Sequence, residues 1–192
     1  MNKRIFSLVL ALVLALASLT VAFAESSATA AVVTIPVVKS MVSSTGVVLP
    51  ADFLVTPVEE TLATQALAKD IAAAITAGSL ETVFGEEAVA LIDQAVLGLT
   101  TVSALKVQEV FPMTVVNYSA AYGDVAITLE LPTEYAANDI VVVVIGYVDA
   151  EGNQVWVVVD VEIVDGDLVI TLPVEALSAA VNADLTCVIL GA

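Results

Sequence analysis

The segment 155–172, VWVVVDVEIVDGDLVITL, constrains the fold more than any other part of the chain. Asp165-Gly166 is a strong hairpin signal, because a two-residue type I′ turn favours Asp followed by Gly. This turn pairs Val164 with Asp167 and continues the ladder on both sides. One face of the hairpin is then wholly apolar and consists of Val155, Val157, Val159, Val161, Ile163, Leu168, Ile170 and Leu172. The register is fixed, because a shift of one residue would bury the carboxylates.

Four carboxylates interrupt this valine-rich segment: Asp160, Glu162, Asp165 and Asp167. Asp160 and Glu162 lie on one strand face, where alternate Cα atoms are roughly 7 Å apart. Calcium takes about six to eight oxygen ligands, usually from a bent loop, and a flat strand face does not provide them. The acidic loop 149–153 has its glycine too early for an EF-hand and lacks the distal glutamate. We therefore expect no metal site, and solvated carboxylates that oppose strand aggregation.

Two helices are predicted between residues 56 and 97. The stretch 56–59, TPVE, has an N-cap threonine, a proline at the first helical position and a glutamate at the third. This helix is expected to reach Ala77 and to end at Gly78, with one apolar stripe of Leu62, Leu67, Ile71 and Ile75. The second helix is expected from Glu86 to Leu97, with Val89, Ile92 and Val96 facing inward.

The remaining pattern is that of short strands. β-Branched or alternating runs predict strands at 32–38, 46–55, 105–111, 125–131, 140–148, 154–164, 167–172 and 185–190, with a short helix at 173–181. Short strands at this spacing are typical of an antiparallel β-sandwich. The predicted class is α+β, a short helical segment packed against an antiparallel, Ig-like β-sandwich.

The first 24 residues are typical of a secretory signal peptide. Lys3 and Arg4 precede an apolar stretch at 5–21, and the sequence 22–24, AFA, places small residues at the cleavage-specifying positions. The sequence therefore predicts cleavage before Glu25 and a secreted, extracellular or surface-associated protein. We expect three segments: a signal peptide at 1–24, N-terminal strands plus two helices at 25–104, and the β-sandwich at 105–192.

The charge of the chain excludes several classes of partner. The sequence has 5 basic and 22 acidic residues, and loss of Lys3 and Arg4 would leave a formal charge of 3 minus 22, or −19. A nucleic-acid-binding protein needs a basic surface to displace counterions, and anionic lipid would repel this chain. We expect no nucleic acid partner and no membrane insertion after signal cleavage.

The composition also argues against catalysis. Histidine is absent and Cys187 is the one cysteine, which excludes a Ser/His/Asp triad, a Cys/His pair and a histidine-based zinc site. A glycosidase site would be expected to show stacking aromatic side chains and a pocket, and the sequence has one tryptophan. We predict a protein that is not an enzyme and needs no cofactor, with Cys187 as a buried small hydrophobe.

One candidate binding surface follows from the hairpin before the acidic segment. A four-residue loop at 150–153 pairs Tyr147 with Trp156 and Ile145 with Val158, on the outer face. These four side chains would form an apolar strip. Two interpretations stay open: the helical segment 57–97 covers the strip, or the strip is an exposed contact surface for a partner.

The stretches AAITAGSLETVFGEEAVALI and VQEVFPMTVVNYSAAYGDVAITLEL resemble uncharacterised secreted proteins of gut Firmicutes. The last third, with its GNQVW and DGDLVITL hairpins, is similar to the β-sandwich modules that end such proteins. The resemblance covers roughly residues 40–192 and implies a helical segment, a C-terminal sandwich and export to the cell surface. It transfers no catalytic or binding residue. The chain departs from a sortase substrate, because no LPxTG motif follows the sandwich.

These observations predict a non-enzymatic, exported, acidic protein that acts as an extracellular interaction or structural module at the bacterial surface. Its expected partner is an extracellular protein or a glycan. The alternative is a binding module for a small ligand, such as a glycan or a peptide, held between helices and sheet. A carboxylate-based hydrolase is the third hypothesis.

Overall fold

The computed structural model describes residues 36–49, 55–57, 61–181 and 183–192. The chain divides into two units, and all described residues belong to the second, Val33–Ala192. The predicted signal peptide lies outside the described residues, as do parts of the strands expected at 32–38 and 46–55.

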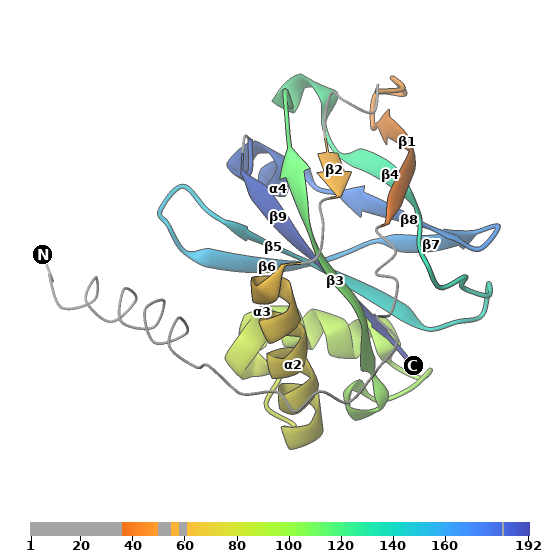
Figure 1. Ribbon diagram of the computed structural model, residues 1–192, viewed down its shortest axis with the longest axis vertical. Coiled ribbons are helices and arrows are strands. Elements are labelled where there is room, and N and C mark those ends of the chain that lie inside the picture. Colours follow the sequence, from red (N-terminus) through yellow and green to blue (C-terminus); the bar gives the residue numbers. More distant parts are fainter. Residues whose placement is uncertain (1–35, 50–54, 58–60, 182) are drawn as a thin grey trace, which may run out of the picture. The chain divides into compact units, whose positions relative to one another are not determined.

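Two antiparallel sheets form the sandwich that the sequence predicts (Figure 1). The four-stranded sheet has the order β1 (Val37–Ser43), β4 (Val125–Glu130), β8 (Asp167–Leu172) and β7 (Val161–Val164). The five-stranded sheet has the order β2 (Val55–Pro57), β3 (Lys106–Val115), β9 (Asp184–Gly191), β5 (Val141–Val148) and β6 (Gln154–Val159). All neighbouring strands are antiparallel.

The strand order is that of an immunoglobulin domain, except that the position of strand G is taken by a strand from an earlier part of the chain. β1-β4-β8-β7 corresponds to the ABED sheet, and β3-β9-β5-β6 corresponds to strands G, F, C and C′. β3 occupies the place of strand G, the last strand of an immunoglobulin domain, although it precedes β4 in the chain. The Ig-like arrangement is therefore confirmed, with the strand beside β9 supplied from the N-terminal side.

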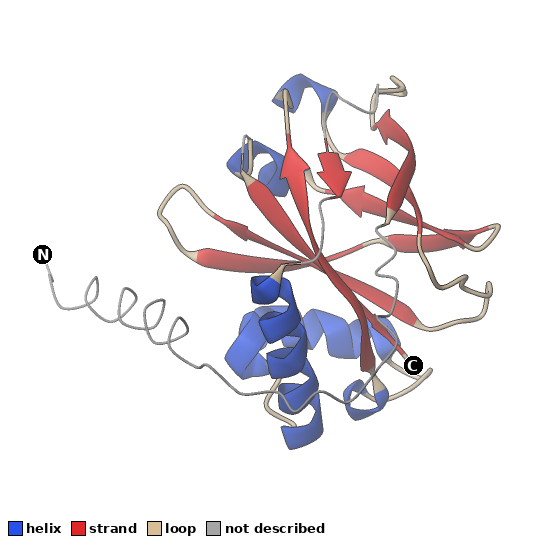
Figure 2. Cartoon of the chain, in the orientation of Figure 1, coloured by secondary structure: helices blue, strands red, loops and turns tan. Residues whose placement is uncertain are grey.

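Helices form a layer on the outer face of the five-stranded sheet (Figure 2). α2 (Leu62–Ala77) packs on β3, and α3 (Glu81–Val96) packs on β6 and β5. A 3₁₀ turn, η1 (Val102–Ala104), contacts both helices. A second turn, η2 (Ala120–Tyr122), and the short helix α4 (Val174–Ala179), expected at 173–181, complete the described helical elements.

The five-stranded sheet is buried on both faces, so two hydrophobic cores share its strands. In β5, Val143 and Ile145 belong to the core between the sheets, whereas Val142 and Val144 belong to the core under the helices. All four are at most 3% exposed. A strand with two buried faces has no polar alternation, which is why residues 141–145 of β5 are a continuous valine and isoleucine run.

The Asp165-Gly166 hairpin is confirmed. Both turn residues have positive φ, 53° and 89°, as a type I′ turn requires, and Val164 pairs with Asp167. The strand expected at 154–164 is divided at Asp160, however. β6 belongs to the five-stranded sheet and β7 to the four-stranded sheet, and the Asp160 carbonyl accepts a hydrogen bond from Thr171 N at 3.1 Å. The chain crosses between the sheets here while its apolar side stays toward the core between them.

The predicted start of the first helix is wrong. α2 begins at Leu62, and Thr61 is its N-cap: Thr61 Oγ1 accepts from Thr64 N at 3.2 Å, and Thr64 Oγ1 accepts from Thr61 N at 2.9 Å. This reciprocal capping satisfies two backbone donors at the start of the helix. Leu62, expected in the apolar stripe, is 84% exposed at the first helical position. Gly78 ends the helix with φ 65°, as predicted.

The residues expected to start that helix lie in a strand. Thr56 and Pro57 pair with Thr114 and Met113 of β3, at the edge of the sheet, where proline is tolerated. The second helix begins before its expected first residue, with a break at Gly85 (φ 81°, ψ 162°) that separates a short first turn from the predicted helix. Because β1 and β2 pair with β4 and β3, strands from both sides of the expected boundary at 104/105 share the sheets.

Two buried tyrosines differ in whether their hydroxyl groups are hydrogen-bonded, and their Phe variants test what each hydroxyl contributes to stability. Tyr135 is 7% exposed, and its buried Oη has no hydrogen-bond partner among the described residues, whereas Tyr118 Oη donates to the Gly123 carbonyl at 2.7 Å. An unpaired buried hydroxyl costs about 1–3 kcal/mol, and a satisfied one contributes about 0.5–1.5 kcal/mol. We expect Tyr135→Phe to raise the free energy of unfolding and Tyr118→Phe to lower it in urea denaturation.

Tyr135→Phe should also change how the stability of the protein depends on pH in the alkaline range. Burial raises the pKa of Tyr135 from 10.0 to about 12. The folded state therefore holds this proton more tightly, and stability is lost as pH rises from the unfolded value toward the folded one. Tyr135→Phe should lose less stability over this interval than the unaltered chain. Equal losses would contradict the burial of this phenol.

Candidate functional site

The four residues of the predicted apolar strip do not share one face. Ile145 is fully buried between the sheets, and the half-buried Tyr147 packs against the same core. Trp156 and Val158 lie on the opposite face of the sheet, half-buried against the core under the helices. The interpretation that the helical segment covers the strip is confirmed for Trp156 and Val158, and the exposed strip is not formed.

The cause is an error of one residue in the expected register. Tyr147 pairs with Val155 and Gly146 with Trp156, not Tyr147 with Trp156. The loop consists of three residues rather than four, because Asp149 N donates to the Asn153 carbonyl at 2.9 Å and closes the hairpin one residue earlier. Gly152, with φ 85°, permits this shorter loop. A shift of one residue moves a side chain to the other face of a sheet.

Trp156 joins α3 to the five-stranded sheet. Its indole packs edge-on against the Phe84 ring, with centroids 5.0 Å apart and an interplanar angle of 73°. The indole also lies across Gly146 of β5, where a Cβ would overlap ring atoms at 2.7 Å. The glycine therefore creates the space that the chain's one tryptophan fills.

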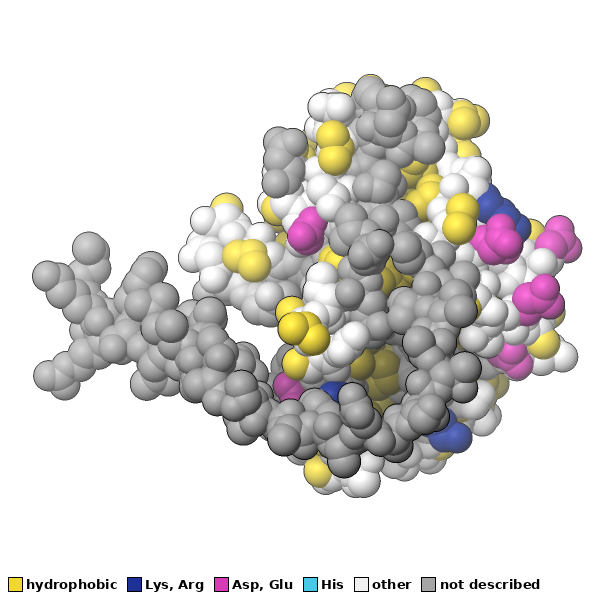
Figure 3. All heavy atoms as spheres, viewed as in Figure 1, with side chains coloured by type: hydrophobic (Ala, Val, Ile, Leu, Met, Phe, Trp, Pro, Cys, Tyr) yellow, Lys and Arg dark blue, Asp and Glu magenta, His cyan; other side chains and the backbone are white. Residues whose placement is uncertain are grey.

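The acidic residues of the Asp165-Gly166 hairpin are placed largely as predicted. Asp160, Glu162 and Asp165 are exposed, but Asp167 is half-buried and its Oδ2 lies 2.8 Å from Lys39 Nζ, which also approaches Glu130 Oε2 at 3.3 Å. The hydrogen bond to Asp167 raises the pKa of Lys39. In Figure 3, acidic side chains gather on the side of the molecule that carries β7 and β8, with a basic side chain among them. Lys39 thus ties edge strand β1 to β8 across β4.

The acidic hairpin loop binds its own backbone. Asp149 Oδ1 accepts from Asn153 N at 2.7 Å, and Oδ2 accepts from Asn153 Nδ2 at 3.1 Å. These hydrogen bonds lower the pKa of Asp149. Within the described residues, no group of three or more Asp, Glu or Cys side chains is arranged to hold a metal ion.

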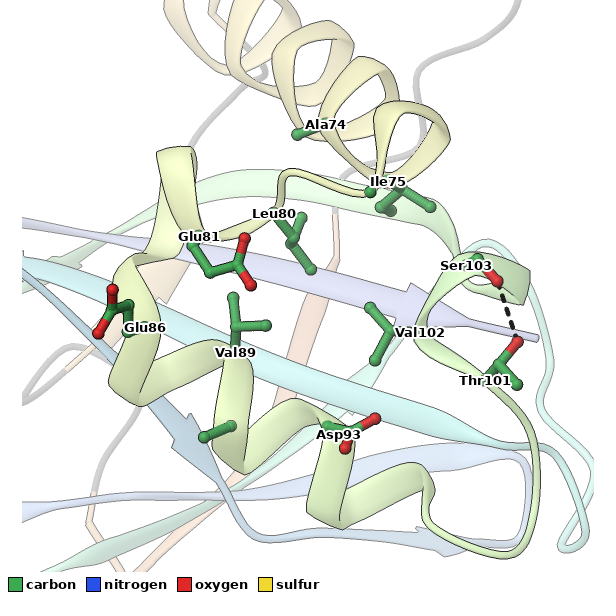
Figure 4. Close-up of a pocket in the computed structure, with 12 residues that line it drawn as sticks. Ala74, Ile75, Leu80, Glu81, Glu86, Val89, Asp93, Thr101, Val102 and Ser103 are labelled. Carbon is green, nitrogen blue, oxygen red and sulfur yellow. Dashed lines mark hydrogen bonds between the residues drawn. The ribbon is translucent and has the colours of Figure 1, made fainter.

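A groove of about 690 Å³ lies between α2, α3 and η1 (Figure 4). Apolar side chains from all three elements line it, including Ile75, Leu80, Val89 and Val102. Its volume falls within the range of ligand sites, about 300–1,000 Å³.

Carboxylates stand around this apolar floor. Figure 4 shows Glu81 beside Leu80 and Val89, Asp93 directed toward Val102, and Glu86 on the side away from η1. All three acids are exposed, and no basic residue is among the described residues of the lining. At the other end, the hydroxyls of Thr101 and Ser103 lie 3.1 Å apart, within hydrogen-bond distance.

The described lining of the groove combines apolar side chains, carboxylates and two neighbouring hydroxyls. The hydroxyls of Thr101 and Ser103 bond to each other rather than to a groove carboxylate, so the described lining offers no nucleophile–base pair. Cys187 is fully buried between the sheets, as predicted, and burial raises the pKa of its thiol far above the ordinary value. The groove offers an apolar surface with negative charge beside it.

The groove is not among the features expected from the sequence. Glu86, Val89 and Asp93 follow the i, i+3, i+7 spacing that places them on one face of α3, and this spacing could have indicated a mixed acidic and apolar surface. The contributions of α2 and η1 depend on how the helices pack, which the local sequence does not specify.

Comparison of the chain with protein-family models, with curated proteins and with solved structures finds no match. We describe the protein by its fold and site alone: it is an Ig-like sandwich with a helical layer, and that layer carries a groove with carboxylates at its rim. Among the described residues, no helix combines the length and apolar character of a membrane span.

The packing of Trp156 against Gly146 can be tested with a glycine-to-alanine variant and a matched control. We expect Gly146→Ala to lower the free energy of unfolding by about 1–3 kcal/mol, because the new methyl group overpacks against the indole. The control is Gly191→Ala in β9, where a Cβ meets only the flexible Gln108 side chain, at 3.0 Å. Its expected loss is below about 1 kcal/mol. Equal losses in urea denaturation, with unchanged tryptophan fluorescence, would contradict this packing.

Proposed function

We propose that this chain is a non-enzymatic, exported interaction module that binds a segment of a partner protein in the groove between α2, α3 and η1. The proposal rests on the combination of an apolar floor with three rim carboxylates and no basic residue in the described lining. Such a site complements a short segment with apolar side chains beside Lys or Arg.

The groove suits a peptide segment better than a glycan or a hydrolase substrate. Glycan sites commonly use aromatic side chains as stacking surfaces, and none of the described residues of the lining is aromatic. A hydrolase of the two-carboxylate type needs one acid with a raised pKa beside an ionised one. The general acid of such an enzyme lies in a buried, apolar environment, whereas Glu81, Glu86 and Asp93 are all exposed.

The proposed setting is the cell exterior, as the N-terminal sequence 1–24 predicts. Strong negative charge keeps a chain with 59% hydrophobic residues soluble and discourages non-specific association. The same charge increases the local concentration of cationic partners near the groove. Export and a surface role remain our proposal, supported by these sequence features.

A peptide titration tests the groove directly. The probe is a capped tetrapeptide with two leucines between two lysines, and the methyl NMR signals of Ile75, Val89 and Val102 report its position. We expect shifts at these methyl groups and a loss of affinity of about 3- to 30-fold in the double variant Glu86→Gln/Asp93→Asn. Raising the salt concentration should weaken binding as well.

The control removes the same charge elsewhere. Glu134→Gln/Glu175→Gln changes two exposed carboxylates outside the groove and should leave the affinity nearly unchanged. Absence of binding, or an equal loss in both double variants, would overturn the proposal, because attraction would then reflect net charge alone.

A further inference from the structure

The four edges of the two sheets differ in how they are protected against pairing with another chain. Exposed edges normally carry a charge, a proline, a bulge or a very short strand. β1 has a register shift at Lys39 and carries that lysine, β2 has three residues and ends in Pro57, and β7 has four residues and contains Glu162. Each of these three edges thus has at least one protective feature.

β6 has none of these features. It lies at the outer end of the five-stranded sheet and pairs only with β5 among the described strands (Figure 1). Its six residues, QVWVVV, contain no charge and no proline, and its pairing with β5 from Val143–Val159 to Val148–Gln154 has no bulge. A regular, uncharged, valine-rich edge is a template for another strand.

The surroundings of β6 can also receive side chains. A hollow of about 410 Å³ lies where the end of β6 meets α3, and its lining includes Leu91, Val141, Val158 and Val161. Leu91 is 43% exposed there, and Asp160 is the one charged side chain of the described lining. Recognition by strand addition uses main-chain hydrogen bonds for affinity and such hollows for specificity.

The acidic residues at both ends of β6 determine which kind of strand could pair with its free edge. Asp149 and Glu151 lie in the loop before β6, and Asp160 and Glu162 follow it. A second copy of this chain would bring acids against acids, since antiparallel self-pairing of residues 154–159 places Glu162 opposite Glu151. Like charges opposite each other destabilise a strand pair, and each copy carries a formal charge of −17.

We propose that the β6 edge is a second interaction surface, which binds an extended segment of a partner by strand addition. The segment has an uncharged, β-branched centre and Lys or Arg at both ends. This surface is separate from the groove, so it does not depend on the function proposed above.

A synthetic strand tests the proposal. The probe is a fluorescent decapeptide with six alternating threonines and valines between two pairs of lysines, and anisotropy measures its affinity for the full chain. We expect binding together with hydrogen-exchange protection of β6 amides. N-Methylation of alternate probe residues, on the edge that faces β6, should weaken binding at least about tenfold, because it removes ladder hydrogen bonds.

Two protein variants distinguish strand addition at the β6 edge from non-specific electrostatic attraction. Val158→Lys places an inward-pointing charge on β6, a device that protects sheet edges, and should abolish binding while the circular dichroism spectrum keeps its sheet signal. Asp160→Asn/Glu162→Gln should lower the affinity about 3- to 30-fold, and the groove variant Glu86→Gln/Asp93→Asn should not.

Three results would overturn the proposal. They are equal affinity for the N-methylated and unmethylated probes, protection of amides elsewhere instead of β6, and dimers of the unaltered chain whose formation is lost in Val158→Lys. The first two would indicate charge attraction at another place, and the third would identify a second copy as the occupant.

Discussion

The double burial of the five-stranded sheet is the constraint on which the rest of the structure depends. β5 and β9 present apolar side chains on both faces, so neither face of this sheet is stable in water without a cover. The four-stranded sheet covers one face, and α2 and α3 cover the other. The helical layer is therefore part of the folding unit, and Trp156, seated over Gly146 and against Phe84, is its central contact.

Much of the sandwich could be predicted from the sequence, because local signals specify it. The Asp165-Gly166 turn fixes the β7–β8 register, and the two faces of that hairpin follow from period two. The β5–β6 register could not be predicted, because the chain 149–153 is compatible with two loop lengths and only the Asp149–Asn153 pairing decides between them. The groove was not predictable either, since it depends on the packing of α2 against η1.

One clear local signal, the helix start at 56–59, failed for a tertiary reason. The stretch 56–59 has the residues of a helix start, yet Thr56 and Pro57 lie beside β3, where pairing with an otherwise open edge outweighs a local preference. The helix then begins at the Thr61–Thr64 capping box. Both proposed binding surfaces arise from the helical layer: the groove lies within it, and the hollow beside β6 lies at its edge. Acidic side chains lie beside both proposed surfaces, which is why we propose cationic partners for both.

The central claim is that helices and sandwich form one cooperative unit held by the doubly buried sheet. Equilibrium urea unfolding with two probes tests it: tryptophan fluorescence reports the α3–β6 contact through Trp156, and the methyl NMR signals of Ile127 and Ile170 report the core between the sheets. We expect the two transitions to coincide at one midpoint. A fluorescence transition at lower urea than the loss of the native methyl signals would show that the helical layer detaches from an intact sandwich, which would contradict the claim of a single unit.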